Sequence, residues 1–183
     1  MRVRIFIDFM NFSLGVKLSC GEGYRLDYQK LSGVLCREAT ECLPAGIYEG
    51  THVYASANPT SRKDQDLVKF FNTTLSTFRG YDISIFERRH KPSPECKMCG
   101  REIEACPHCG NPTSGTIEKG VDAAIVTGML SHAWNDSYDI GVLLSTDRDF
   151  IPAVEFLHRR GKKSFTPALV KKVVNYQESV GAE

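Results

Sequence analysis

Aspartates stand beside apolar runs in three separate parts of this 183-residue chain. One directly follows an apolar run, one precedes such a run, and two come shortly after a third: Asp8, Asp122, Asp147 and Asp149. In open α/β sheets, ligands bind at the carboxyl ends of the strands. Crowded carboxylates repel each other unless a cation lies among them, and hard divalent cations such as Mg²⁺ prefer oxygen ligands. The pattern therefore predicts a metal-dependent site on an α/β sheet.

Short apolar runs alternate with segments of helical periodicity along most of the chain. The expected strands are 3–7, 52–57, 81–86 and 140–144, with a short fifth at 163–165. The expected helices are 26–43, 64–78, 119–134 and 150–160, with a last one at 167–174. This alternation indicates βα units with right-handed crossovers. We therefore expect an α/β protein, a three-layer αβα sandwich with a central, mostly parallel sheet, formed by one domain over residues 1–183.

Composition limits the class of protein. Hydrophobic residues make up 42% and charged residues 25%, which is typical of an ordinary soluble core. No apolar run approaches the roughly 20 residues that span a bilayer. The apolar run at the N-terminus is short and ends at Asp8, unlike a signal peptide. We therefore expect a cytoplasmic protein that does not bind membranes.

The net charge of +1 excludes a chain that attracts polyanions as a whole. The basic residues are instead concentrated in three clusters, at 88–91, 159–163 and 171–172. Such clusters contact phosphates in nucleic-acid-binding proteins, or they lie exposed on helix ends and loops. Both interpretations stay open on the sequence alone.

Residues 88–118 interrupt the alternation and are rich in Pro, Cys, Gly and charge. They contain two C-x-x-C-G motifs, formed by four of the seven cysteines: Cys96, Cys99, Cys106 and Cys109. The odd number of cysteines argues against a disulfide framework. Two such knuckles supply four thiolates to a closed, structural Zn²⁺ site, whereas a thioredoxin-like redox pair needs a C-x-x-C at the start of a helix. We predict an insert held together by zinc. Whether it contacts nucleic acid stays open.

The usual topology brings the acids together. If strand 3–7 is central, with the second and third strands on one side and strand 140–144 on the other, Asp8 and Asp147 meet at one edge. Asp122 then projects over that edge and Asn11 adds an amide. Carboxylates around one or two Mg²⁺ or Mn²⁺ ions suit phosphodiester hydrolysis. The chain has no G-x-S-x-G, P-loop or G-x-G-x-x-G motif, which disfavours other hydrolase and nucleotide-cofactor classes.

Each acid also has a purely structural interpretation. Asp8 fits an N-cap, Asp122 fits a first-turn acid, and Asp149 fits a cap before Pro152. Asp147 has less structural reason to stand where it does, which favours it as a metal ligand.

Three motifs together resemble the NYN domain, a branch of the PIN-like nucleases. They are I-F-I-D-F-M-N at 5–11, E-K-G-V-D at 118–122 and S-T-D-R-D-F at 145–150. The resemblance implies a PIN-like fold and a metal-dependent ribonuclease. It assigns the metal-binding acids to Asp8, Asp122 and Asp147, with Asp149 as a further acid and Asn11 beside them. Thr146 stands where the family more often has Gly or Ser. A cysteine-bearing insert before E-K-G-V-D recurs in some members.

Basic residues near these motifs are the expected phosphate contacts: Arg88, Arg89, Lys119 and Arg148. Trp134 and Tyr138 either stack a base or pack between helix and strand. The expected activity is an endoribonuclease. The alternatives are a non-catalytic RNA-binding or scaffolding module, or a phosphohydrolase acting on DNA or nucleotides. RNA is the expected partner, DNA is an alternative, and a protein partner or a second copy of the chain stays open.

Overall fold

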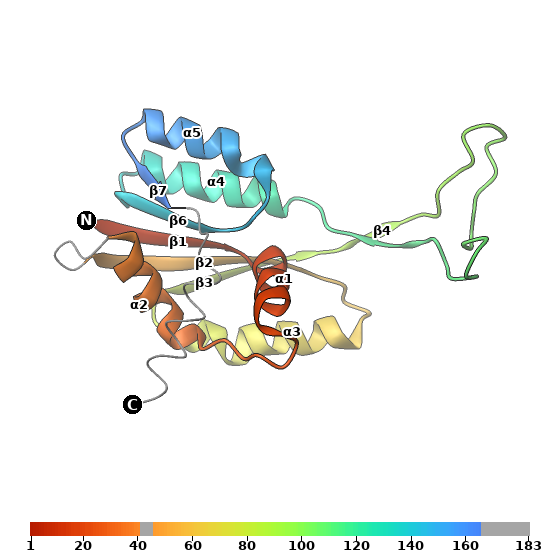
Figure 1. Cartoon of the computed structure of the whole chain (residues 1–183), viewed down its shortest axis with the longest axis horizontal. Coiled ribbons are helices and arrows are strands. Elements are labelled where there is room, and N and C mark those ends of the chain that lie inside the picture. The colour runs from red at the N-terminus through yellow and green to blue at the C-terminus, as the bar shows by residue number, and fades with distance from the viewer. Residues whose placement is uncertain (41–45, 166–183) are drawn as a thin grey trace.

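The structure is a computed structural model that describes residues 1–40 and 46–165. Five parallel strands form one sheet in the order β3-β2-β1-β6-β7 (Figure 1). These strands are β1 Arg2–Asp8, β2 Ile47–Ala57, β3 Tyr81–Glu87, β6 Ile140–Leu144 and β7 Lys163–Phe165. The prediction of a central first strand, with the second and third strands on one side and 140–144 on the other, is confirmed.

Helices cover both faces of the sheet (Figure 1). One face packs against α1 Phe9–Cys20, α2 Tyr28–Ala39 and α3 Arg62–Thr73, and the 3₁₀ turn η1 Leu75–Thr77 follows α3. The other face packs against α4 Val121–Trp134 and α5 Ile151–Arg159. The 3₁₀ turn η2 Arg148–Phe150 directly precedes α5. The expected three-layer αβα sandwich is therefore confirmed.

The central strands are apolar because both of their faces are covered. In β1, Val3, Ile5 and Ile7 pack on the α1–α3 side, whereas Phe6 packs on the α4–α5 side. All five residues of β6 are buried. The side-chain period of two then places Asp8, like Phe6, on the α4 side of the sheet.

Several boundaries differ from the expected ones. The helix expected at 26–43 begins at Tyr28, because Asp27 accepts hydrogen bonds from two backbone N–H groups as its N-cap. The helix expected at 64–78 ends at Thr73, and the 3₁₀ turn η1 follows it. The helix expected at 119–134 begins at Val121, after left-handed Gly120. Residues 41–43 and the last expected helix, 167–174, lie outside the described residues.

α1 was absent from the helices expected from apolar periodicity, and only the N-cap interpretation of Asp8 indicated it. Its three buried residues, Phe9, Phe12 and Val16, face the core, but Leu14 and Leu18 are exposed, so the apolar residues form no single stripe. Among the described residues, no helix has the length and apolarity needed to cross a membrane.

Gly128 in α4 determines how closely that helix approaches the sheet. A Cβ at this position would clash with the hydroxyl of Tyr54, a buried residue of β2. By contrast, Gly33 in α2 is exposed and has open space around it.

We predict opposite effects of the two glycine-to-alanine substitutions on the free energy of unfolding. Gly128→Ala lowers it by about 1–3 kcal/mol, because α4 must shift away from β2. Gly33→Ala raises it by about 0.5–1 kcal/mol through helix propensity. Urea denaturation of both variants checks this, and equal effects would contradict the close approach at Gly128.

Two histidine rings, His52 of β2 and His132 of α4, lie in tilted contact between the sheet and the helix. The rings of His52 and His132 have centroids 4.5 Å apart, and Phe6 stacks on His52. The Arg4 guanidinium lies 2.9 Å from His52 Nε2, and Asp82 lies 3.2 Å from Nδ1. Burial, then the charges of His132 and Arg4, lower the pKa of His52 to about 4, although Asp82 opposes them. Burial also lowers the pKa of His132.

These histidines make the folded state sensitive to acid. Because the folded pKa of His52 lies below the ordinary histidine value of 6.5, the unfolded chain binds the proton more readily. Stability is therefore fully present above about pH 6.5 and falls as the pH drops from there toward about 4. Urea denaturation between these values checks the loss. His52→Gln should flatten the dependence, whereas His108→Gln, on an exposed loop, should leave it unchanged.

Candidate functional site

Asp8 is the last residue of β1 and the N-cap of α1. It is only 5% exposed, accepts a hydrogen bond from the Asn11 N–H at 3.3 Å, and accepts one from Ser145 Oγ at 3.0 Å. Burial raises the pKa of Asp8, and the charges of Glu118 and Asp122 raise it further, although both hydrogen bonds oppose the rise. Asp8 thus caps a helix, as one interpretation of the sequence allowed, and also lies among other carboxylates.

The register of the sheet brings the ends of β1 and β6 together. Ile7 pairs with Leu144, so the next residues, Asp8 and Ser145, lie side by side. Asn11 joins the same edge from α1, because its Oδ1 accepts hydrogen bonds from the Thr146 N–H at 2.9 Å and from the Thr146 hydroxyl at 3.0 Å. Asn11 therefore holds the loop after β6 in place, and Thr146 uses the hydroxyl that glycine lacks.

Asp147 is the N-cap of η2. Its Oδ1 accepts from the Asp149 N–H at 2.9 Å, and its own N–H donates to Ser145 Oγ at 3.1 Å. The capping role that the sequence favoured for Asp149 was therefore wrong, because the 3₁₀ turn begins two residues earlier than the expected helix. Both carboxylates are exposed.

Asp122 lies in the first turn of α4, which follows the left-handed Gly120 with its φ of 87°. Burial raises the pKa of this carboxyl, and nearby carboxylates raise it further: Asp147, Glu118 and Asp149. The start of a helix normally stabilises a negative charge, whereas the neighbouring carboxylates disfavour it at Asp122. The charge of Asp122 therefore acts on the same edge as Asp8 and Asp147.

Glu118 is an acid of this edge that was not among the expected site residues. The Ser56 hydroxyl at the end of β2 donates to Glu118 Oε2, and Arg88 Nε donates to Ser56 Oγ at 3.0 Å. The Arg88 guanidinium also lies 4.0 Å from Glu118. The available signal was its position as the first residue of the E-K-G-V-D motif. We call Asp8, Glu118, Asp122, Asp147 and Asp149 the acidic edge.

The acidic edge is not a closed metal cage. Over residues 1–40 and 46–165, no three His, Cys, Asp or Glu side chains converge closely enough to hold a metal ion. The donor set nevertheless fits a hard divalent cation, because it consists of carboxylates, with Asp8 anchored by hydrogen bonds and Asp147 exposed, and because neighbouring charges raise the pKa of Asp8 and that of Asp122.

The expected phosphate contacts divide into two groups. Arg89, Lys119 and Arg148 are exposed, whereas Arg88 is partly buried in the network with Ser56 and Glu118. Neither aromatic candidate for base stacking lies at the edge. Tyr138 is fully buried, and its hydroxyl donates to the carbonyl of Met129 at 3.0 Å. Trp134 ends α4, so twelve residues and about 18 Å of helix separate it from Asp122.

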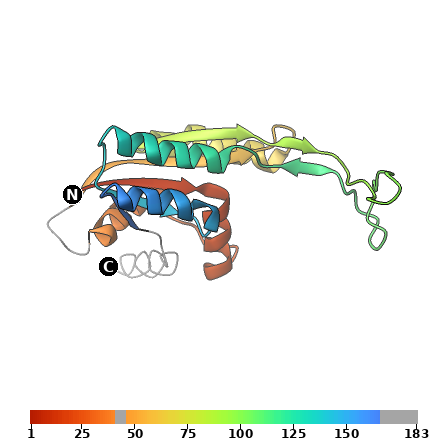
Figure 2. The same ribbon diagram turned by 90° about the horizontal axis from the view of Figure 1, so that it is seen from above.

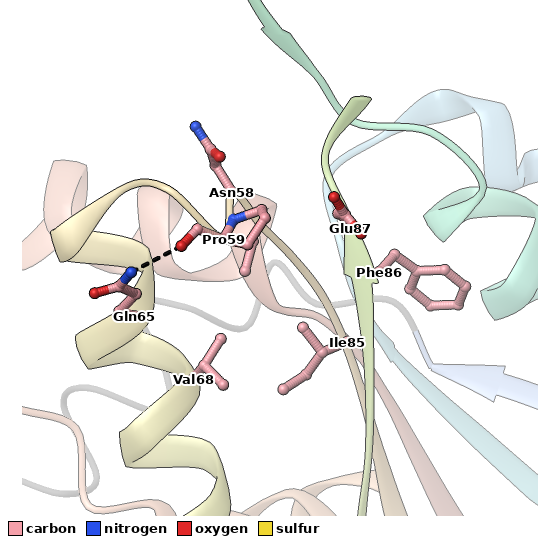
Figure 3. A pocket seen from close by; sticks show the side chains of 8 residues that line it. Asn58, Pro59, Gln65, Val68, Ile85, Phe86 and Glu87 are labelled. Carbon is pink, nitrogen blue, oxygen red and sulfur yellow. Dashed lines mark hydrogen bonds between the residues drawn. The ribbon is translucent and has the colours of Figure 1, made fainter. Parts of the chain in front are cut away.

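A separate pocket of about 370 Å³ lies where β2 and β3 end and α3 begins (Figure 3). Its walls are mostly apolar, with Val68 of α3 opposite Ile85 of β3, and Gln65 donates a hydrogen bond to the carbonyl of Pro59 at 2.8 Å. It lies on the α3 side of the sheet, whereas Asp8 faces α4. None of the acids of the acidic edge lines it.

Residues 88–118, which we call the arm, extend away from the sandwich (Figures 1 and 2). The base of the arm is a two-stranded antiparallel ribbon of β4 Arg89–Lys91 and β5 Gly115–Ile117. Its outer part holds the two knuckles, residues 96–100 and 106–110.

The two knuckles have the same local geometry. In the first, the Gly100 N–H donates to the Cys96 carbonyl at 2.8 Å and Gly100 has a φ of 72°. In the second, the Gly110 N–H donates to the Cys106 carbonyl at 2.8 Å and Gly110 has a φ of 70°. Backbone N–H groups directed at sulfur lower the pKa of the first thiol in each knuckle. Each knuckle is thus formed locally, but the structure does not bring the four sulfurs together.

A three-layer αβα sandwich with acids gathered where adjacent parallel strands end defines a protein of the PIN-like fold class. The family model of the NYN domain matches residues 2–175, so the chain belongs to the NYN domain family. The predicted resemblance is therefore confirmed.

Among solved structures, the chain is similar to the crystal structure of VPA0982, a protein of unknown function from Vibrio parahaemolyticus. The two are 18% identical, the match covers 90% of this chain and 79% of that chain, and the TM-score is 0.49. No curated protein matches this chain.

Proposed function

We propose that the protein is a metal-dependent ribonuclease that hydrolyses RNA phosphodiester bonds at the acidic edge. One observation carries the proposal: acids from three distant segments, represented by Asp8, Asp122 and Asp147, lie where β1 and β6 end, and the charges of neighbouring carboxylates raise the pKa of Asp8 and that of Asp122. Such mutual repulsion is unfavourable in a protein that binds no cation there. Membership of the NYN domain family, a branch of the PIN-like nucleases, supports RNA as the substrate.

The residues of the edge have distinct tasks in this proposal. Asp8 is held by Ser145 and by the start of α1, so its carboxylate is a fixed ligand. Asp122 and Asp147 complete the ligand set for Mg²⁺ or Mn²⁺. A cation bound there would make water a better nucleophile and neutralise charge on the phosphate. Asn11 maintains the loop that carries Asp147 through its bonds to Thr146.

Exposed basic residues beside the acids orient the substrate. Lys119 and Arg148 each adjoin an acid of the edge in the sequence, and both are exposed. Cations at these positions attract a phosphodiester toward carboxylates that would otherwise repel it. Arg88 acts differently, because its guanidinium neutralises part of the charge of Glu118.

We predict that Asp8→Asn and Asp147→Asn each reduce RNA cleavage by more than about 100-fold, since even outer-sphere partners of a metal ion contribute 10–100-fold. The measurement is cleavage of labelled single-stranded RNA in Mn²⁺, with matched DNA in parallel. Asp66→Asn is the matched control, because Asp66 is an exposed acid of α3. Cleavage by both site variants at the parental rate would refute the site.

The same assay separates the competing functions. A non-catalytic RNA-binding module retains RNA in EDTA and yields no products in Mn²⁺. A phosphohydrolase for DNA or nucleotides cleaves those substrates in preference to RNA, and this activity is also lost in Asp8→Asn.

The arm forms a second metal centre in this proposal, a structural Zn²⁺ site. Both knuckles direct N–H groups at the first sulfur, as thiolate ligands require, and four thiolates leave no open position for catalysis. Binding of one ion by both knuckles requires them to approach each other. The cytoplasm, where thiols stay reduced, suits such a site.

We predict that the purified protein contains one zinc ion per chain. Cys96→Ser and Cys106→Ser each lose it, because either change removes a ligand from one knuckle. Elemental analysis gives the stoichiometry, and the absorption of a Co²⁺-substituted sample reports tetrahedral thiolate ligation. Cys20→Ser, in α1 and outside the knuckles, should retain the metal. Retention of zinc by both knuckle variants would exclude the four-thiolate site.

A further inference from the structure

The ribbon at the base of the arm carries its charge on one strand. All three residues of β4 are basic and exposed: Arg89, His90 and Lys91. The facing residues of β5 are uncharged, since Arg89 pairs with Ile117 and Lys91 pairs with Gly115. Arg89 and Lys91 are two positions apart in a strand, so their side chains project from the same face, about 7 Å apart.

These cations have no acidic partner in the described part of the chain. None of the ion pairs found there involves Arg89, Lys91 or Lys119. The nearest acid along β5, Glu118, is already engaged by Ser56 and Arg88. Exposed cations without counter-charges create a positive potential that attracts an anionic ligand.

Both strands of the ribbon lead directly to the acidic edge. β4 begins one residue after Arg88, whose N–H donates to the carbonyl of Ala57 at the end of β2 at 2.9 Å. β5 ends at Ile117, five residues before Asp122, a separation that the chain spans in at most about 17 Å. Figures 1 and 2 show the ribbon leaving the sandwich at the end of the sheet where β1, β2 and β3 terminate.

We infer that the β4–β5 ribbon binds the phosphate backbone of the RNA strand beyond the cleavage site, with Arg89 and Lys91 as the contacts. This inference rests on the proposed function and adds a substrate class to it. The preferred substrates are single strands long enough to lie on the acidic edge and along the ribbon together. Contacts to phosphate carry no sequence information, so the ribbon selects for length and not for sequence.

The test compares a ribbon variant, Arg89→Ala with Lys91→Ala, and a control variant, Arg159→Ala with Lys163→Ala. The control removes the same charge from exposed positions at the end of α5 and the start of β7, at the opposite end of the sheet from the acids. The probes are single-stranded RNAs of about 20 and about 4 nucleotides, which bracket the 4–16 nucleotides that one binding module covers. The zinc-loaded full chain is used throughout.

Binding is measured first, with Asp8→Asn in every protein so that no RNA is cleaved. The plot of log K against log salt has a negative slope. For the long RNA, this slope should become less negative by about 1.4 in the ribbon variant, since each of the two lost phosphate contacts on a single strand contributes about 0.7. The slope for the short RNA should not change, and the control variant should behave as the parent with both probes.

Cleavage is measured second, with Asp8 restored. The parent should cleave the long RNA with a higher kcat/KM than the short one, and the ribbon variant should lose this difference. An unchanged salt slope in the ribbon variant, or an equal fall in the control variant, would overturn the inference. If none of the proteins cleaves RNA but the ribbon variant alone shows a weaker salt dependence of binding, the proposed ribonuclease activity is refuted and the contact between ribbon and RNA is supported.

Discussion

The parallel pairing of β1 with β6 determines where the acids of this molecule lie. Because Ile7 pairs with Leu144, the chain leaves both strands at the same level, and Ser145 can donate its hydroxyl to Asp8. Asn11 then bonds the loop that follows β6, which places Asp147. Covering helices bury both faces of this strand pair, so the position of Asp8 is fixed by the core of the protein and not by a mobile loop.

Electrostatic cost is the second consequence of this geometry. Asp8 and Asp122 have raised pKa values because burial and neighbouring carboxylates both disfavour their charged forms. Two kinds of contact stabilise these negative charges: Asp8 accepts two hydrogen bonds, and the guanidinium of Arg88 lies beside Glu118. A bound cation would offset the remaining negative charge of the acidic edge, and the basic ribbon supplies positive charge just outside this edge. Metal, acids and ribbon thus form one electrostatic unit in our account.

The sequence predicted the strand order and the gathering of Asp8 with Asp147, because buried strands leave a strong apolar signal and topology follows from their alternation. It indicated α1 only through the possible N-cap at Asp8, because exposed leucines obscure the helical stripe. It did not predict the cap at Asp147, which depends on a 3₁₀ turn. Glu118 was overlooked because its partners, Ser56 at the end of β2 and Arg88 after β3, come from distant parts of the chain. The local geometry of the knuckles was predictable from their spacing, whereas their joint binding of one zinc ion stays a prediction.

Thermal unfolding with and without Mn²⁺ tests the central claim, that the acidic edge is destabilised by its own charge until a cation binds. We predict that Mn²⁺ raises the Tm of the parent protein. We also predict that Asp122→Asn raises the Tm without metal, because it removes one charge from a group of repelling carboxylates, and that it weakens the Mn²⁺ effect. The account would be contradicted if Mn²⁺ left the Tm of the parent unchanged and if the metal-free Asp122→Asn variant had a lower Tm than the parent.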